Sequence, residues 1–367
     1  MPELSDIIGQ DEAIGRLRRA MAGQRMPHAY LFAGPAGVGR RTTAVAFAKT
    51  LLCENPTPSR QACGTCSSCR MAAAGTHPDL QLIYKELAAY HDNADIRNRV
   101  MQQLGIAVIR SFLIAPAGRS AAHGRGKVFV VLDAELLSIA AQNAMLKTLE
   151  EPPAGVTIIL ICRQPERLLA TTLSRCAMVR FRPLPSDFVR GRLIDAGVKE
   201  PEARFWSAYT EGSLGLALRL EQSGMYEIKC DLLKRLSGPT DDAELSEHLK
   251  KTADNLATAA VNASKKAEGS TLSKALASRR AAGTMLQLIA SAYRDAITIA
   301  AGVDRPLAHS DQQTEIRILA DRFEPAKLAA VIEQLSAYER LLWRNVNPRI
   351  IWDNVVITCD SAAALRL

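Results

Sequence analysis

Four of the eight cysteines in this chain lie close together, with a spacing that suits a metal ion. Two residues separate Cys63 from Cys66 and Cys66 from Cys69, and nine residues separate Cys53 from Cys63. Small turns can gather thiolates at this spacing, and Zn²⁺ prefers four such ligands in a tetrahedron. The cluster therefore predicts a structural zinc; the alternatives are a reduced cluster without metal and a redox role. The other four cysteines are scattered singly and are expected to be small buried hydrophobic residues: Cys162, Cys176, Cys230 and Cys359.

A glycine loop that begins at Gly34 forms a second candidate site. Loops of the pattern G-x-x-x-x-G-K-[ST] hold nucleotide phosphates with backbone amides, a lysine and a hydroxyl that binds Mg²⁺. Gly34, Gly37 and Gly39 are present, but Arg40 stands in place of the lysine and Arg41 in place of the hydroxyl. Because a planar guanidinium is not equivalent to an ammonium, we expect a degenerate P-loop that could bind ATP without hydrolysing it. A glycine turn without a ligand and a working ATPase loop are the alternatives.

An acidic residue follows the apolar run 127–132, where a P-loop nucleotidase carries its Mg²⁺-associated acid. This residue is Asp133, and the next position, usually the glutamate that activates the attacking water, is Ala134. Glu135 comes one residue later and is expected to point elsewhere. Taken alone, Asp133 is equally a helix cap or turn residue. Together with the glycine loop, it indicates a nucleotidase fold that has lost its hydrolytic groups.

The elements that position these residues form an α/β pattern. Parallel strands that are buried on both faces are typically continuous apolar runs, without the alternation of a half-exposed strand. Helical patterns separate the runs, which predicts a parallel sheet with helices on both faces. After residue 181 only helical patterns follow, so we expect an α/β domain at 1–183 with the cysteine module at 53–69, and helical domains at 184–239 and 240–367. The apolar runs are 29–33, 80–84, 127–132, 157–162 and a shorter one at 179–181.

Composition excludes several classes of protein. The 367 residues are 48% hydrophobic and 23% charged, as in ordinary globular proteins. The apolar run 157–162 is far shorter than the ~20 residues of a membrane span, and the N-terminus lacks a secretory signal. We therefore expect a cytoplasmic protein with reduced cysteines. The net charge of +8 permits a phosphate-rich partner, although a solvated surface explains it equally. Candidate contacts to DNA phosphates are Arg16, Arg18, Arg19 and the basic stretch 274–280.

Motifs along the whole chain resemble the δ′ family of clamp-loader subunits of bacterial DNA polymerase III, which is part of the AAA+ family. The resemblance leaves 86–103 and most of 240–340 poorly covered, and no role is assigned to the insertion 86–103. Its matching stretches are the glycine loop, the cysteine cluster, 7–12 (IIGQDE), 143–153 (NAMLKTLEEPP), 165–169 (PERLL), 174–176 (SRC), 212–215 (GSLG) and 345–349 (NVNPR).

The resemblance implies a RecA-like AAA+ domain, a small helical lid domain and an all-helical C-terminal collar domain. It further implies one copy in a hetero-pentamer with γ/τ and δ subunits, which loads the sliding clamp onto primer–template DNA in the nucleoid-associated replisome. Zinc in this family is structural. The Ser-Arg-Cys motif of the family supplies an arginine finger to the ATP of a neighbouring subunit, and here that residue is Arg175. The alternative for Arg175 is an ordinary surface arginine.

Each position at which the chain departs from an active loader ATPase indicates a loss of ATP hydrolysis. Besides Arg40, Arg41 and Ala134, the chain has Cys162 near the place of a sensor Thr or Asn, and Gly215 in place of a sensor arginine. We therefore expect an accessory subunit that does not hydrolyse ATP by itself and completes an ATP site on a neighbour. An active γ/τ-like ATPase is the alternative, and a zinc-ribbon protein that binds nucleic acid without a loader role is a further one.

Overall fold

The computed structural model describes residues 3–23, 26–97, 103–123, 125–238, 241–266, 273–344 and 346–360. Contacts within the chain divide it into two compact units. The first consists of Met1–Pro185 and Gly212–Gly215, and the second of Ser186–Glu211 and Leu216–Leu367. Helices expected for a lid and for a collar thus belong to the same unit, and the three-domain division with boundaries at 184 and 240 stays a prediction.

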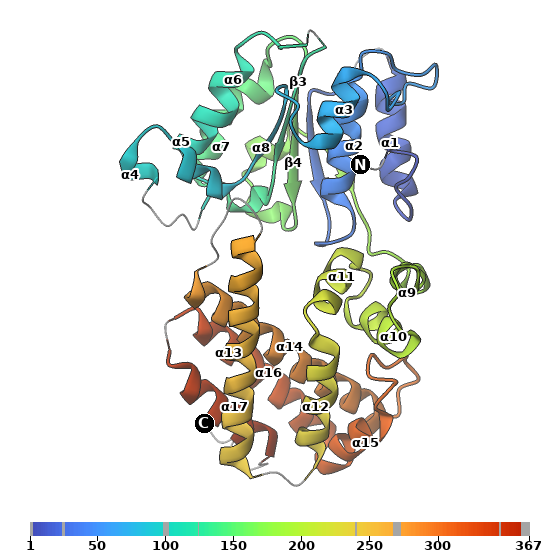
Figure 1. Ribbon diagram of the computed structural model, residues 1–367, viewed down its shortest axis with the longest axis vertical. Helices are drawn as coiled ribbons and strands as arrows, with labels where there is room; N and C mark the ends of the chain where they lie inside the picture. The colour runs from blue at the N-terminus through green and yellow to red at the C-terminus, as the bar shows by residue number, and fades with distance from the viewer. Residues whose placement is uncertain are drawn as a thin grey trace. The chain divides into compact units, whose positions relative to one another are not determined.

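The first unit is built on a five-stranded parallel sheet, as the apolar runs predict (Figure 1). Its strand order is β2-β3-β4-β1-β5, so β4 lies between β1 and β3. Every residue of β1, β3 and β4 is buried, which explains why these strands are apolar without alternation. The strands are β1 (Ala29–Ala33), β2 (Leu80–Ile83), β3 (Lys127–Val131), β4 (Val156–Cys162) and β5 (Ala177–Arg180).

Helices cover both faces of this sheet (Figure 1). Tyr30 and Phe32 pack with one set of helices, while Leu31 packs with the other, because successive strand residues point to opposite faces. The first face is covered by α1 (Asp11–Ala22) and α2 (Arg40–Leu52), and the second by α5 (Ile106–Ile109), α6 (Ala115–Ala117) and α7 (Ile139–Glu150). The remaining α-helices of this unit are α3 (Ser67–Ala74), α4 (Ala94–Arg97) and α8 (Ala170–Leu173).

Helix boundaries differ from the sequence prediction at three places. Helix α2 begins at Arg40, whereas the sequence predicts a helix over 42–52, because Gly39 takes the left-handed conformation just before it (φ +98°). Helix α7 begins at Ile139, whereas the sequence predicts a helix over 136–150, since the Ser138 hydroxyl caps it by accepting the amide of Ala141 at 3.2 Å. A π-helical turn, Arg110–Ile114, interrupts the helix expected at 106–115. In the insertion 86–103, residues 98–102 lie outside the described residues.

The second unit is helical, and its described residues contain no strand. Long helices dominate: α14 packs against α13 and α16, and α17 against α13. The sequence predicts a break in the C-terminal helices at Gly269–Ser270, and these two residues lie outside the described residues. Among the described helices of the whole chain, none is long and apolar enough to cross a membrane. The helices after the sheet are α9 (Ser186–Asp195), α10 (Glu200–Tyr209), α11 (Leu214–Gln222), α12 (Met225–Ser237), α13 (Asp242–Lys266), α14 (Lys274–Ala300), α15 (Gln313–Arg322), α16 (Pro325–Leu342) and α17 (Pro348–Asp360).

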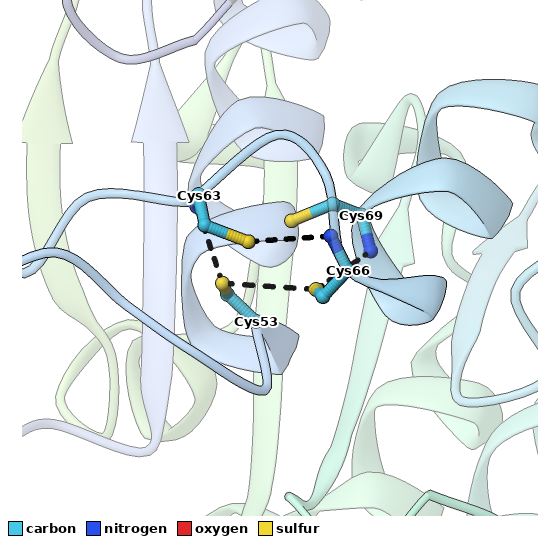
Figure 2. Close-up of side chains that lie close together, drawn as sticks. All are labelled: Cys53, Cys63, Cys66 and Cys69. Carbon is cyan, nitrogen blue, oxygen red and sulfur yellow. Dashed lines mark hydrogen bonds between the residues drawn. The ribbon is translucent and has the colours of Figure 1, made fainter.

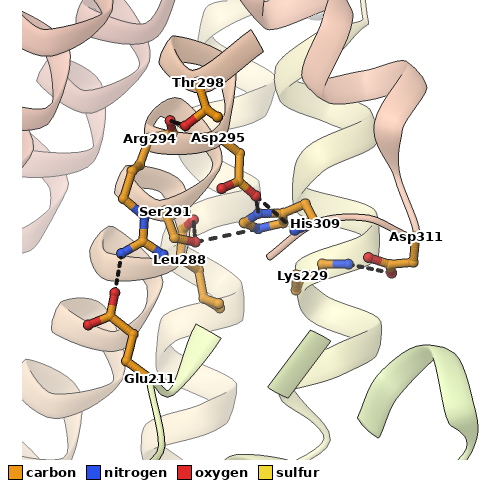
Figure 3. A network of polar contacts seen from close by, with 9 residues as sticks. All are labelled: Glu211, Lys229, Leu288, Ser291, Arg294, Asp295, Thr298, His309 and Asp311. Atoms are coloured by element: carbon orange, nitrogen blue, oxygen red, sulfur yellow. Dashed lines mark hydrogen bonds and ion pairs between the residues drawn. The ribbon is translucent and has the colours of Figure 1, made fainter. Parts of the chain in front are cut away.

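Buried polar groups fix the segment between α14 and α15 to the rest of the second unit (Figure 3). The Asp295 carboxylate accepts the backbone amide and Nδ1 of His309 at 2.8 and 2.9 Å. Lys229, on α12, is fully buried and pairs with Asp311 at 2.5 Å. Its ammonium also lies 4.2 Å from the centre of the Phe205 ring, on α10. These contacts join α10 and α12 to the C-terminal helices.

Candidate functional site

The glycine loop begins where β1 ends. Gly34 has a φ of +150°, and a Cβ at this position would lie 2.3 Å from the carbonyl oxygen of Phe181. Only glycine fits so close an approach of two backbones. The Gly34 amide donates to the carbonyl of Cys162, the last residue of the neighbouring strand β4, at 3.3 Å. The loop and the end of β4 are therefore held side by side.

Donors from other segments bind the carbonyl groups of the loop. The segment Gly212–Gly215 supplies two of them, and Gly215 lies so close that a Cβ on it would be 3.1 Å from the Cα of Gly37. A sensor arginine at 215 would therefore require this segment to move. The bonds to the loop are Ser213 Oγ to Ala36 O (2.8 Å), Gly215 N to Gly37 O (2.9 Å), Gln10 Nε2 to Val38 O (3.2 Å) and Thr43 N to Gly39 O (2.8 Å).

Arg40 does not extend into solvent as a surface arginine does. Its side chain is buried, with the residue only 7% exposed, and its Nε and Nη1 have no hydrogen-bond partner in the described part of the chain. Burial lowers the pKa of Arg40, while the nearby carboxylate of Glu135 acts in the opposite direction. Arg41, by contrast, is exposed. The loop thus holds one buried cation whose donors are incompletely used.

The acids after β3 are paired with an arginine. Arg163 directly follows β4, and its Nε donates to Glu135 Oε1 at 2.9 Å. Its backbone amide donates to Glu135 Oε2 at 3.2 Å, and its Nη2 lies 3.5 Å from Asp133 Oδ1. Burial alone would raise the pKa of Glu135, but hydrogen bonds from its own amide and from Arg163 hold that pKa below the usual range.

The expectation that Glu135 points away from the site is wrong. Asp133 takes a left-handed conformation (φ +47°), and the 3₁₀ turn Ala134–Leu136 follows it. This turn brings the Glu135 carboxylate, only 4% exposed, towards Arg163 and Arg40. Ala134 is fully buried and has no group that could activate water. Cys162 is also buried, which raises the pKa of its thiol to about 12, so it is an uncharged thiol at neutral pH.

The four clustered cysteines do come together in space (Figure 2). Their sulfur atoms all lie within 4.8 Å of one another, and Cys53 Sγ is 3.9 Å from Cys66 Sγ. A zinc ion with Zn–S bonds of about 2.3 Å has sulfur–sulfur edges of roughly 3.8 Å. The end of α2 supplies Cys53, and the start of α3 supplies Cys66 and Cys69. The donor set therefore fits a tetrahedral metal ion.

Backbone amides stabilise the sulfur atoms. The amides of Cys63, Cys66 and Cys69 each donate to the sulfur of the preceding cysteine of the cluster, at 3.3 to 3.4 Å. Hydrogen bonds from the backbone of Thr65 and of Cys66 lower the pKa of Cys63 to about 6. Because Zn²⁺ binds thiolates, donors placed in this way favour metal binding.

A second layer of polar groups surrounds the cluster. The Glu54 carboxylate accepts the hydroxyl of Ser67 at 2.7 Å and the amide of Ser68 at 3.1 Å. The amide of Asp79 donates to Nδ1 of the buried His77, so the Nε2 of His77 carries the proton and donates to Ser68 Oγ at 2.8 Å. Ser68 in turn donates to the carbonyl of Leu52 at 2.7 Å. Sequence reasoning did not find these residues.

Arg175 lies at the surface, between α8 and β5, which is an edge strand of the sheet. Its side chain is 31% exposed. Its Nε donates to Glu150 Oε1 at 2.6 Å, and its Nη1 donates to the carbonyl of Thr171 at 2.8 Å. Arg175 is thus held from the side by Glu150, the last residue of α7. It is not part of the cluster formed by Arg40, the acids and Arg163.

The other residues singled out in the sequence differ in how far they are buried. Cys162 and Cys359 are buried, as expected, whereas Cys176 and Cys230 are partly exposed. The clustered arginines of α1 all lie at the surface, where a role in binding DNA phosphates stays a prediction. These residues are Arg16, Arg18 and Arg19.

The buried parallel sheet with helices on both faces, the glycine loop after β1 and the acid after β3 together define an α/β domain of the P-loop type. Profiles of the families described as "DNA polymerase III, delta subunit" and "DNA polymerase III, delta subunit, C terminal" match residues 9–185 and 246–359. The two matches lie in separate parts of the chain, and these two regions belong to the two DNA polymerase III delta-subunit families.

Relatives with known names agree with this assignment. The DNA polymerase III subunit delta′ of Pseudomonas aeruginosa is 40% identical over 43% of this chain and 44% of its own length. The delta′ subunit of Escherichia coli K12 is 34% identical over 57% of this chain and 59% of its own length. The subunit tau of Bacillus subtilis is 26% identical over 96% of this chain and 60% of its own length. The chain thus matches about half the length of these relatives.

Proposed function

We propose that this chain is a delta′-type subunit of the DNA polymerase III clamp loader, which helps to load the sliding clamp onto primed DNA. It does not hydrolyse ATP itself, and it supplies Arg175 as an arginine finger to the ATP of a neighbouring γ/τ subunit. Its partners are the γ/τ and δ subunits and, through them, the clamp and primer–template DNA, with one copy in a hetero-pentamer. The delta′ relatives support this assignment.

The observation that carries the non-hydrolysing role is the pairing of both acids with Arg163. Phosphoryl transfer depends on a correctly placed Mg²⁺ and on a group that orients the attacking nucleophile. A metal ion next to Asp133 would meet the guanidinium of Arg163, which already partly neutralises that carboxylate. The loop also lacks the hydroxyl that would bind Mg²⁺ at 41, and Ala134 cannot activate water.

The role of Arg175 rests on its exposure and its remaining donors. A guanidinium has five N–H groups, and in Arg175 the Nε and Nη2 groups face Glu150 while Nη1 faces the Thr171 carbonyl and the Ser174 hydroxyl. These contacts orient the guanidinium and leave one N–H group of Nη2 for a phosphate oxygen, so the surface contacts must partly exchange for the phosphate when the neighbour binds. A positioned arginine stabilises the charge that spreads over the γ-phosphate in the transition state.

The cysteine cluster has a structural role in this proposal. Four thiolates saturate a tetrahedral Zn²⁺, so no open position remains for chemistry. The ion would tie the end of α2, at Cys53, to the start of α3, at Cys66 and Cys69. It would thereby hold in place the helix that carries the glycine loop at its other end.

Reconstitution with candidate partners tests the proposed function. We expect the chain to co-purify with γ/τ and δ subunits, and to raise their ATP hydrolysis in the presence of the sliding clamp and primer–template DNA. The purified chain alone should show no turnover above that of a mock preparation. Hydrolysis by the chain alone would favour the γ/τ-like ATPase. An assembly of γ/τ and δ that hydrolyses ATP equally well without the chain would contradict the accessory role.

A further inference from the structure

Cys53 is the member of the cysteine cluster that no local turn positions. The other three cysteines follow one another at intervals of three residues, so the turns between Cys63 and Cys69 gather them. Cys53 precedes Cys63 by ten residues and directly follows the end of α2. A fixed place for its sulfur therefore requires contacts that tie the chain beside it to the start of α3.

Two such contacts flank Cys53, and both involve Ser68. The residue before Cys53 is Leu52, whose carbonyl accepts the hydroxyl of Ser68 at 2.7 Å. The residue after Cys53 is Glu54, whose carboxylate accepts the amide of Ser68 at 3.1 Å. Ser68 is fully buried and directly precedes Cys69, whereas Glu54 is partly exposed. The hydroxyl of Ser68 thus makes the better protected of the two ties between Cys53 and the helix that carries Cys69.

His77 directs this hydroxyl towards Leu52. A hydroxyl group can rotate, and it has a single proton to donate. The Nδ1 of His77 accepts the amide of Asp79 at 3.0 Å, so its Nε2 carries the proton and donates to Ser68 Oγ at 2.8 Å. Since this donor occupies one side of the oxygen, the hydroxyl turns its own proton to the carbonyl of Leu52. His77 is only 4% exposed, so water competes little for these bonds.

We propose that His77 is a positioning residue for the metal, which acts through Ser68 to hold Cys53 where its sulfur joins the other three. Both ring nitrogens of His77 are already bonded, so it acts without being a ligand. The sheet fixes this arrangement in turn, because the carbonyl of Asp79 accepts the amide of Val128, in β3, at 2.8 Å. The inference rests on the structural zinc of the proposed function. It adds a residue that sets the zinc affinity without touching the ion.

The zinc affinity of the full chain, measured by competition with a chelator of known affinity, tests the proposal. H77N and H77Q form a matched pair, because both replace the imidazole with a neutral amide. The amide nitrogen of glutamine reaches the place of Nε2, whereas that of the shorter asparagine reaches only the place of Nδ1. We expect H77N to weaken zinc binding about tenfold, as is typical when a group that orients a ligand is lost. H77Q should bind zinc about as tightly as the wild type, because it keeps a donor for Ser68.

His91 provides a control, because it makes the same pair of bonds in another part of the first unit. Its Nδ1 accepts the amide of Asn93 and its Nε2 bonds to Ser111 Oγ, both at 3.0 Å. H91N should therefore keep the wild-type zinc affinity. S68A replaces H77N if that variant does not fold, and it should also weaken zinc binding about tenfold, because the tie to Leu52 is lost.

Two results would overturn the inference while leaving the zinc site itself in place. One is an unchanged zinc affinity in whichever of H77N and S68A folds, and the other is an equal loss of affinity in H77N and H77Q. A wild-type chain that binds no zinc would overturn the inference together with the structural zinc. Each of these results would leave the reconstitution test untouched, because that test depends on the partner subunits.

Discussion

Replacing Arg163 with methionine should destabilise the first unit, because it leaves the Glu135 carboxylate buried without its main partner. Methionine keeps the length and much of the apolar volume of the side chain but removes the charge and all N–H donors. The Glu135 side chain is 4% exposed, so water cannot fully replace the lost bonds. The backbone amide of residue 163 still donates to Glu135, and Arg40 stays nearby.

The size of the effect follows from the geometry of the pair. Hydrogen bonds to charged groups contribute roughly 1.5–3 kcal/mol, and breaking a fully buried ion pair costs about 3–5 kcal/mol. The Arg163 side chain is 49% exposed, so the cost of breaking this pair lies at the lower end of these ranges. We therefore expect R163M to lower the free energy of unfolding of this unit by about 2 kcal/mol at pH 7. That value corresponds to about a 30-fold increase in the opening equilibrium.

Hydrogen exchange of the strands β3 and β4 measures this free energy in the unit concerned. The three tryptophans, Trp206, Trp343 and Trp352, all belong to the second unit, so their fluorescence would not report it. R182M provides a matched control, because the pair between Arg182 and Glu12 is exposed on both sides. Such pairs contribute little, and we expect a change of less than about 0.5 kcal/mol.

The pKa of Glu135 determines how the free energy of unfolding of this unit depends on pH. The folded-state pKa of Glu135 lies below its ordinary value, so its contribution is fully present above about pH 4.3 and is lost as the pH falls through the lowered folded-state pKa. The deficit of R163M relative to the wild type should therefore be largest near neutral pH and shrink in acid. Equal protection in R163M and the wild type at pH 7, or a deficit no larger than that of R182M, would refute the reasoning.

Three further predictions concern zinc, hydrolysis and pH. The purified, untagged chain should contain about one zinc ion. C69S should lose both the metal and stability, whereas the control C176S should keep the metal. A wild-type protein without metal would rule out the zinc site. R40K should not create ATPase activity in the isolated chain, because Arg41 and Ala134 remain; turnover above a mock preparation would show otherwise. Lowering the pH below about 6.5 should destabilise the second unit, because burial lowers the pKa of His309 and the unfolded chain then binds the extra proton. Urea unfolding followed by Trp fluorescence at several pH values measures this loss, and in H309Q the free energy of unfolding should depend less on pH. If it depended on pH as strongly in the variant as in the wild type, His309 would be excluded as the cause.

The sheet could be predicted from the sequence because its strands are buried on both faces. Burial makes β1, β3 and β4 continuous apolar runs, and such runs are visible without knowledge of their neighbours. Helix starts were predicted less accurately than strands, since each start depends on a single capping residue. The hydroxyl of Ser138 sets the start of α7, although the apolar pattern extends further back.

The site was predictable only where its residues follow one another in the chain. The cysteine cluster and the glycine loop are local patterns, and the structure brings the four cysteines together. Arg163 could not be found in this way, because it meets Glu135 only through the pairing of β3 with β4. Ser213 and Gly215 contact loop residues that lie more than 170 positions earlier in the sequence, so no local sequence pattern could predict these contacts.

Clamp loading by an assembly that carries R175A is the most direct test of the central claim, namely that this chain assists hydrolysis on a neighbouring subunit. The assembly should form normally and keep its zinc, because the polar contacts of the partly exposed Arg175 side chain are with Glu150, Thr171 and Ser174 and not with the four clustered cysteines. Arginine fingers contribute roughly 10³–10⁵ in rate at one site, so the rate of clamp loading should fall strongly, and R175K should restore little of it. R167A, which removes an exposed arginine from the turn after β4, is the control and should load clamps at the wild-type rate. A correctly assembled R175A complex that loads clamps as fast as the wild type would contradict the account.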